Sequence, residues 1–368
     1  TEHTVLSRPP DPAFDLRAGT TVIVDEAATA STPKLAQLAR LADQHDWRII
    51  LVGDPRQFTA VGRGGMFAHL VDSHGAVELD RVHRFGHAWE RQASLRLRTG
   101  DPAALVEYHR RGRIHGGTPE QMETAIIAAW QEARSRGDTV ALMANNTDTV
   151  IRLNRLAQQT RITTGELALA GPSLRVGENK MLVGDEVVTR RNNRTLRTDQ
   201  GLMVKNRDHW IITCIHRDRS VTLTGRTGVV QLPAEYVTEH LELGYAQTSH
   251  ATQGRTVDVG LLLVDSPIDS RGVYTPMTRG REANHAFVVT DDNQTSLDVL
   301  IQALARDWID KPAVARRIEL GLARQRQGKP PLPGEPDEVD ELMRHARRRS
   351  AERQERRRRI ERTLGRGL

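Results

Sequence analysis

Two short aliphatic runs near the start of the chain each stop at acidic residues. The first covers 21–24 and is followed by Asp25 and Glu26, and the second covers 48–52. Between them, 32–45 has the apolar spacing and the early proline that are typical of a helix, with Ser31 or Thr32 as its N-cap. The pattern predicts a β-α-β unit with parallel strands, so that both strand ends lie at the ligand-binding edge of a sheet.

Longer apolar periodicities predict a second α/β region farther along the chain. Buried strands and amphipathic helices alternate there, as in a parallel sheet covered by helices. The expected elements are helices over 88–112 and 119–136, strands at 140–143, 260–264 and 286–290, and a helix capped by Thr147 or Asp148.

The pattern changes between about 173 and 240, where short runs alternate apolar and polar residues. Runs at 186–190, 209–213 and 220–224 are separated by residues that favour turns. This pattern favours antiparallel strands. We interpret the segment as a small antiparallel β-barrel inserted into the second α/β region.

The C-terminal part has a different composition. A proline-rich linker at 329–334 precedes a charged stretch, 337–363, with helix-forming composition, and eleven arginines fall between 344 and 366. The arginines could bind a nucleic-acid backbone in a salt-dependent way. A solvated linker helix explains them equally well.

Composition restricts the class of protein. The 368 residues are 38% hydrophobic and 27% charged, which is ordinary for a globular chain of two or three domains. No apolar run approaches membrane-spanning length, and no signal peptide is recognised. The single Cys214 excludes a disulfide framework and a cysteine-based zinc site. We therefore expect a cytoplasmic protein without a membrane partner.

The charge balance is basic. The formal net charge is +6, and 48 of the 53 basic residues are arginine. Coding bias in a GC-rich genome explains much of the ratio of arginine to lysine. The excess positive charge still makes a polyanionic partner plausible, because arginine makes bidentate contacts with phosphate.

The acids at the two strand ends suit a magnesium nucleotide, with Asp25 on the metal and Glu26 orienting a water. Taken alone, the pair could equally be a strand end whose aspartate caps the next helix. A phosphate-binding loop of the form G-x-x-x-x-G-K-[ST] does not occur in these 368 residues, and the one Gly-Lys pair, Gly328-Lys329, lies beside the proline-rich linker.

Five segments, in order, resemble the motifs of superfamily-one helicases of the RecD-like branch, and they are closest to the helicase region of TrwC/TraA/TraI-type conjugative relaxases. The likeness covers 20–295. The segments are Asp25-Glu26 (motif II), 53–57 (motif III), 79–85 (motif IV), 245–256 (motif V) and 274–281 (motif VI).

The resemblance implies a fold class and a domain plan. The fold is α/β, with two RecA-like P-loop NTPase domains, of which the first is truncated, and an SH3-like β-barrel inserted in the second. The implied parts are a partial first domain over 1–77, a second domain over 78–172 and 241–328, the barrel over 173–240, and the linker and arginine-rich tail over 329–368.

The resemblance also implies roles in ATP hydrolysis. Asp25 would hold Mg²⁺, Glu26 would activate water, and Gln57 would sense the γ-phosphate. Arg84 and Arg279 would neutralise charge on the transferred phosphoryl group. The implied nucleotide-binding set is Asp25, Gly53, Asp54, Gln57, Gly254 and Arg279.

Contacts with DNA are implied at two helix starts. Thr248 and His250 lie in the motif V segment, and Asn145 and Thr147 follow a buried strand, where backbone amides and small polar groups can hold phosphates. Ordinary helix capping is an alternative at both places.

These observations favour a region of an ATP-dependent single-stranded-DNA translocase or helicase, from a conjugative relaxase acting in plasmid transfer. Its partners would be single-stranded DNA, the missing N-terminal part of the same polypeptide and the conjugation machinery. Because the phosphate loop is missing, we expect the isolated chain to hydrolyse ATP poorly. The alternative is an ATP-independent nucleic-acid-binding module that has lost this loop, whereas a different magnesium NTPase is disfavoured by motifs IV to VI.

Overall fold

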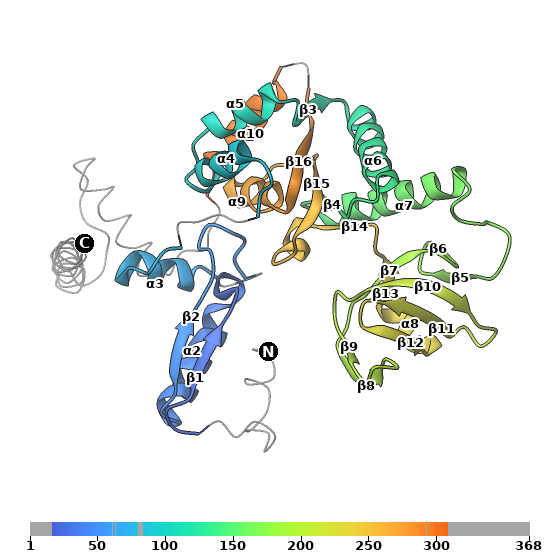
Figure 1. Cartoon of the computed structure of the whole chain (residues 1–368), viewed down its shortest axis with the longest axis horizontal. Coiled ribbons are helices and arrows are strands. Elements are labelled where there is room, and N and C mark those ends of the chain that lie inside the picture. The colour runs from blue at the N-terminus through green and yellow to red at the C-terminus, as the bar shows by residue number, and fades with distance from the viewer. Residues whose placement is uncertain (1–16, 61, 63, 80–83, 292, 308–368) are drawn as a thin grey trace, which may run out of the picture. The chain divides into compact units, whose positions relative to one another are not determined.

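The computed structural model describes residues 17–60, 62, 64–79, 84–291 and 293–307. The described residues up to 79 belong to one compact unit, and those from 84 to 307 form the other. The predicted proline-rich linker and arginine-rich tail lie outside the described residues. Figure 1 shows the elements of each unit.

The first unit is built on the predicted β-α-β pattern. Strands β1 (Thr21–Val24) and β2 (Arg48–Leu51) pair in parallel, and α2 (Thr32–Gln44) connects them with Ser31 as its N-cap. The 3₁₀ helix η1 (Ala27–Thr29) and α3 (Met66–His74) complete the unit. A small hydrophobic core holds these elements together, formed by Val24, Ala27, Ala28, Leu38 and Phe67.

The second unit contains a five-stranded sheet in which every neighbouring pair is parallel. The central strand β15 is the apolar run that the sequence predicted. The order across the sheet is β14 (Ala246–Thr248), β4 (Val140–Ala144), β15 (Val257–Val264), β16 (Gly280–Val289) and β3 (Ile114–Gly117).

Helices cover both faces of this sheet (Figure 1), and β15 shows how the layers are separated. Leu261 and Leu263 pack into one core with α6 (Pro119–Ser135) and α7 (Thr147–Thr163). Leu262 and Val264 point into the opposite core. That core receives α4 (Ala88–Arg98), α5 (Ala103–Arg110), α9 (Ser270–Tyr274) and α10 (Ser296–Leu304).

Two expectations about helices are corrected. The region 88–112 is not continuously helical, because it breaks between α4 and α5, where Gly100 has a φ of 75° and Pro102 follows. The cap of α7 is Asn146, not Thr147 or Asp148, and its side chain accepts a hydrogen bond from the Thr149 amide.

The predicted alternating segment forms antiparallel sheet. Its main sheet has the order β12-β11-β10-β7-β13, accompanied by the strand pairs β5-β6 and β8-β9. The elements are β5 (Ser173–Val176), β6 (Asn179–Leu182), β7 (Glu186–Thr189), β8 (Asn193–Arg197), β9 (Met203–Val204), β10 (His209–Ile215), β11 (Val221–Gly225), β12 (Gly228–Leu232), α8 (Ala234–His240) and β13 (Leu241–Leu243).

This antiparallel insertion shares a hydrophobic core with the parallel sheet. Trp210, Ile212 and Leu223 of the insertion belong to the same buried cluster as Trp130 of α6 and Leu153 of α7. Across the described part of the chain, no helix is both long enough and apolar enough to cross a membrane.

Candidate functional site

The acidic residues of the first unit lie where its two parallel strands end. Val24 is paired with Leu51, and the chain continues this contact because the Val52 amide donates to the Val24 carbonyl at 2.9 Å. The Ala27 amide in turn donates to the Val52 carbonyl at 2.9 Å. The structure therefore places the turn after β1, which carries Asp25 and Glu26, beside the turn after β2.

The turn after β1 has an unusual backbone. Asp25 is exposed, and its Oδ1 accepts the Glu26 amide at 2.8 Å. Glu26 itself adopts a left-handed conformation with φ 51° and ψ 40°. A non-glycine residue pays a conformational cost there, and such outliers cluster at functional sites.

The turn after β2 is packed tightly against the first turn. A Cβ on Gly53 would come within 3.0 Å of the Ala27 amide nitrogen, so a larger residue would push the two turns apart. Asp54 Oδ1 accepts the Arg56 amide at 3.0 Å, and the Asp54 carbonyl accepts the Gln57 amide at 3.2 Å. The Gln57 Oε1 atom is buried and has no hydrogen-bond partner among the described residues.

The donor chemistry of these turns fits Mg²⁺. Carboxylate oxygens are its preferred protein ligands, and a nucleotide-bound Mg²⁺ takes only one or two of them, completing its shell with phosphates and water. Asp25 and Asp54 are the residues that would hold the ion, and the buried Gln57 oxygen is an acceptor that a ligand hydrogen could satisfy.

In the second unit the structure brings the two predicted arginines to one place. Arg84 Nη1 donates to the Thr278 carbonyl at 2.5 Å, immediately before Arg279. Arg279 is 1% exposed, and it donates from Nε to the Thr275 carbonyl at 2.8 Å and from Nη2 to Thr278 Oγ1 at 3.0 Å. Both guanidinium groups are thus tied to the 3₁₀ helix η3 (Pro276–Thr278), which ends just before β16.

The motif V segment contains β14 and the 3₁₀ helix that follows it. Thr248 pairs with Ala144 at the end of β4 and caps the 3₁₀ helix η2 (Ser249–Thr252), where its Oγ1 accepts the Ala251 amide at 3.2 Å. His250 is partly buried, and burial together with the nearby Arg207 lowers its pKa. Gly254 follows with a φ of 79°, which glycine adopts without strain.

The predicted residues after β4 lie at the same edge of the parallel sheet. The Asn146 side chain donates to Asp265 Oδ1 at 3.0 Å while capping α7, and Asn145 Nδ2 lies 3.5 Å from the Gly272 carbonyl. Asn145 and Thr147 thus follow the end of β4 closely, and Thr248 is the last residue of β14, where it pairs with the last residue of β4. The four predicted DNA contacts gather at the C-terminal edge of neighbouring strands.

Sequence reasoning missed a buried polar network beside the arginines. Glu90, Tyr108 and Asn284 are fully buried, and the Tyr108 hydroxyl and the Asn284 amide both donate to Glu90 Oε1. Glu90 looks like an exposed helix charge in sequence. The only available signal was Asn284, which lies close after the motif VI segment.

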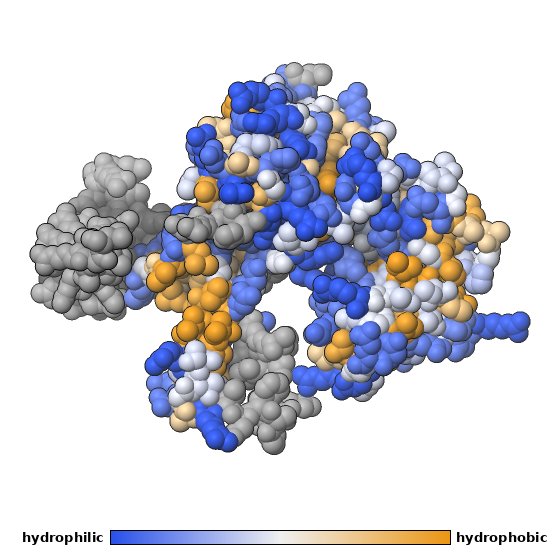
Figure 2. Space-filling model, viewed as in Figure 1, coloured by the Kyte–Doolittle hydropathy of each residue, from blue (hydrophilic) through white to orange (hydrophobic). Residues whose placement is uncertain are grey.

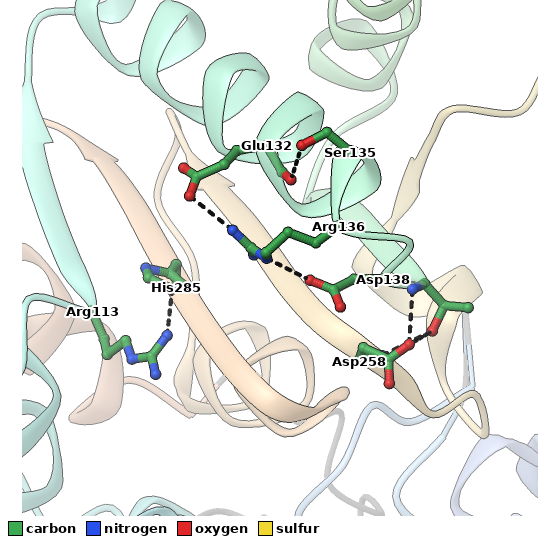
Figure 3. A network of polar contacts seen from close by, with 8 residues as sticks. Arg113, Glu132, Ser135, Arg136, Asp138, Asp258 and His285 are labelled. Atoms are coloured by element: carbon green, nitrogen blue, oxygen red, sulfur yellow. Dashed lines mark hydrogen bonds and ion pairs between the residues drawn. The ribbon is translucent and has the colours of Figure 1, made fainter.

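Sequence reasoning also missed a histidine pair, His115 and His285, of which His285 is drawn with Arg113 in Figure 3. Arg113 Nη1 lies 2.6 Å from His285 Nε2, and His285 Nδ1 lies 3.2 Å from His115 Nε2. Burial and the Arg113 charge lower the pKa of both histidines, that of His285 to about 3. Nearby, Arg136 bridges Glu132 and Asp138 on the surface of α6.

A small cavity of about 60 Å³ lies between the parallel sheet and the antiparallel insertion. His209 Nε2 accepts there from Arg255 Nη1 at 2.7 Å and lies 2.5 Å from Gln247 Nε2. Burial and Arg255 lower the pKa of His209 to about 4, so this imidazole is neutral near pH 7. The contacts tie the motif V segment to β10 of the insertion.

A family model described as an AAA domain matches residues 2–119. The conjugal transfer protein TraA of Agrobacterium fabrum is 31% identical over 274 residues, and TraA of Rhizobium radiobacter is 29% identical over 268. Each match covers 72% of this chain and 24% of the relative. The RecD subunit of the RecBCD enzyme from Mycolicibacterium smegmatis is 28% identical over 291 residues, covering 71% of this chain and 48% of the subunit.

Two solved helicase structures share the fold. The Pif1 helicase of Candida albicans aligns with a TM-score of 0.51 at 13% identity, over 83% of this chain and 76% of that one. A Bacteroides Pif1 helicase in complex with ADP-AlF3 and single-stranded DNA aligns with a TM-score of 0.50 at 16% identity, over 89% and 84%. The fold is therefore that of an α/β P-loop NTPase with a parallel sheet and an antiparallel insertion.

These findings confirm the predicted resemblance. The chain is homologous to TraA conjugal transfer proteins and to the RecD subunit of the RecBCD enzyme. It spans about a quarter of the length of the TraA relatives that it matches.

Proposed function

We propose that this chain is the motor region of an ATP-dependent single-stranded-DNA translocase that acts in conjugative DNA transfer in the cytoplasm. The observation that carries the proposal is the meeting of the Arg84 and Arg279 segments at Thr278. Two arginines far apart in sequence converge on one short turn, and arginine is a recurring group for neutralising charge on a transferred γ-phosphoryl group.

We interpret the units as the RecA-like domains of such a motor. The first unit would be the partial first domain, and the second unit the second domain with its inserted SH3-like barrel. Asp25 would hold the nucleotide-bound Mg²⁺ and Glu26 would orient the attacking water, while Gln57 would sense the γ-phosphate. The ion would polarise the phosphates when it is bound.

The surface of the first unit supports its interpretation as part of a larger domain. Ile23 and Ile50 are paired across β1 and β2, yet they are 65% and 43% exposed, and Val52 is 43% exposed. Parallel sheets occur almost only with both faces covered. Hydrophobic surface also gathers over this unit in Figure 2. We infer that further α/β structure carrying the phosphate loop covers this face.

A DNA-stimulated ATPase assay of the 368-residue chain tests the dependence on that loop. We expect little or no turnover, because the amides and lysine that normally hold the β- and γ-phosphates do not occur in this sequence. Robust turnover would show that the chain supplies its own phosphate site. The alternative function, an ATP-independent nucleic-acid-binding module, is favoured by the same missing loop.

Binding of a fluorescent oligo-dT tests the DNA track proposed at Asn145, Thr147, Thr248 and His250. We expect affinity to fall about 50-fold from about 50 to about 200 mM salt, as for about four phosphates of a single strand neutralised by arginines of this unit. A Thr248→Val variant should bind more weakly. A Thr163→Val variant, changed at an exposed threonine in the last turn of α7, should bind as the parent does. Salt-independent binding, or a strict preference for duplex, would contradict the proposal.

A further inference from the structure

The two segments that carry the arginines run alongside each other in a fixed register. Arg84 Nη1 donates to the Thr278 carbonyl at 2.5 Å, and the Gly86 amide donates to the Arg281 carbonyl at 2.7 Å. Six residues after Arg84, Glu90 Oε1 accepts from Asn284 Nδ2 at 2.8 Å. The contacts advance in the same direction along both segments, so a shift of one segment has to move the other.

Asn284 connects the two paired segments to Arg279. Its Oδ1 accepts the Gly280 amide at 2.7 Å, and its Nδ2 donates to the Gly280 carbonyl at 2.8 Å as well as to Glu90. The Asn284 amide thus holds both backbone groups of the residue next to Arg279. Gly280 has no space for a side chain, since a Cβ would lie 2.1 Å from the Ala283 carbonyl oxygen.

Glu90 anchors Asn284 from the helix side. It is 0% exposed, and its Oε1 also accepts from the Tyr108 hydroxyl of α5 at 3.1 Å. Its Oε2 is buried without a hydrogen-bond partner among the described residues, and burial raises its pKa. Burying a carboxylate this way is unfavourable, and apolar side chains of similar size would often be at least as stable.

This cost indicates that the network serves to fix geometry, because the hydrogen bonds that Glu90 Oε1 and Asn284 make hold the elements that share them in one arrangement. The carboxylate lies on α4, which begins four residues after Arg84, and its partner amide holds Gly280, the first residue of β16, which follows Arg279.

We propose that Glu90 and Asn284 are positioning residues, which hold the Arg279 guanidinium in the orientation needed at the γ-phosphate and couple it to Arg84. This inference rests on the proposed role of Arg279 in ATP hydrolysis. Neither residue contacts the nucleotide in this proposal, so both act through the backbone at Gly280.

The orientation of Arg279 can be read directly from the nuclear magnetic resonance signal of its Nε–H group in the 368-residue chain, identified by its loss in an Arg279→Lys variant. We expect Glu90→Gln to leave this signal in place, because the glutamine oxygen can still accept from Asn284 and Tyr108. Glu90→Ala and Asn284→Asp should shift the signal and speed its exchange with water, since each removes the donor–acceptor match. Tyr108→Phe should give a smaller shift of the same kind.

A matched control comes from the same helix. Ser94 is a buried polar residue of α4 whose hydroxyl donates to the Arg91 carbonyl at 2.8 Å, within its own helical turn. Ser94→Ala should leave the Arg279 signal unchanged. An unmoved signal in folded Asn284→Asp and Tyr108→Phe, or an equal shift in Ser94→Ala, overturns the proposal even where Glu90→Ala fails to fold.

Hydrolysis by the natural polypeptide that carries this chain provides a second readout. Glu90→Ala should lower kcat about tenfold or more while KM stays within about twofold, because an arginine that acts on the transition state affects the chemical step. Glu90→Gln should restore kcat to within about twofold of the parent. If the parent shows no DNA-stimulated hydrolysis, the proposed function fails, whereas the resonance signal still decides whether Glu90 and Asn284 position Arg279.

Discussion

The acidic turns of the first unit and the arginine segments of the second are held in opposite ways. Asp25 is exposed at the end of a two-stranded sheet. Ile23, a residue of the first of these strands, is 65% exposed. Arg279 is 1% exposed and lies beside a five-stranded sheet and a buried polar network. The acids depend on the local shape of one turn, whereas the arginines depend on contacts between residues almost two hundred positions apart.

The two regions also differ in the free-energy term that opposes their folding. In the first unit the cost lies in the backbone, because Glu26 has a left-handed conformation with φ 51°. In the second unit it lies in desolvation, because Glu90 is a buried carboxylate. Substitutions in the two regions should therefore change hydrolysis and folding stability in different proportions.

The largest expected effect is on hydrolysis by the natural polypeptide. Arg279→Lys should lower the DNA-stimulated rate about 10³-fold, because an ammonium cannot reproduce the planar fork that an arginine presents to a phosphoryl group. Arg271→Lys is the matched control. Arg271, on α9, is also buried, but it forms an ion pair with Asp307 at 2.8 Å. Equal losses in both variants would show that any buried arginine of this unit is needed only for folding.

The second effect compares how core substitutions in the two units change folding stability. Leu262→Ala should destabilise the second unit by about 2–5 kcal/mol, because Leu262 is fully buried on the central strand. Ile23→Thr should change the stability of the 368-residue chain by less than about 0.5 kcal/mol, since that side chain is mostly exposed. Denaturant titration measures both. A large loss in Ile23→Thr would mean that its face is covered within this chain.

The third effect is a dependence on pH in the second unit. The folded-state pKa of His285 is lowered to about 3, so its contribution to stability is complete above the unfolded value near 6.5 and is lost as pH falls toward 3. We expect the second unit to lose about 1–2 kcal/mol from this group between about pH 7 and about pH 5. His285→Gln should flatten the profile by this amount, and an unchanged slope would contradict the assignment.

The smallest expected effect is a gain in stability. Glu26→Gly should stabilise the first unit by about 0.5 kcal/mol, because glycine adopts a positive φ without strain but loses more chain entropy on folding. Asp46→Gly is the matched control, since Asp46 also has a positive φ, 53°. Calorimetry should show both gains, while only Glu26→Gly lowers hydrolysis by the natural polypeptide. A loss of stability in Glu26→Gly would show that its carboxylate has a structural role.

The sequence predicts helices and strands well where the pattern of apolar positions is unambiguous. The run from 260 to 264 is apolar throughout and forms the central strand, because a parallel strand covered on both faces excludes polar side chains. The break between α4 and α5 was missed, although Gly100 and Pro102 mark it. The cap of α7 was placed one or two residues too late, because threonine, aspartate and asparagine all favour that position.

Apart from the family resemblance, which paired Arg84 with Arg279, the residue pattern could group candidate site residues only along local strand ends. Asp25 and Glu26 follow a strand, and their neighbourhood with Gly53 follows from parallel pairing. The contact of Glu90 with Asn284 spans 194 positions and leaves no local pattern. A charged residue in a helix predicts solvent exposure, so only the packed structure identifies Glu90 as buried.

The hydrophobic core that runs from α6 and α7 into the antiparallel insertion has a consequence for how this protein can be altered. Trp210 and Trp130 belong to one cluster, so the insertion and the parallel sheet should melt in a single cooperative transition. Excising the insertion to shorten the protein would bare that shared apolar surface and leave an aggregating remnant. The insertion is therefore an integral part of its host fold, and its interior can change only in concert with α6.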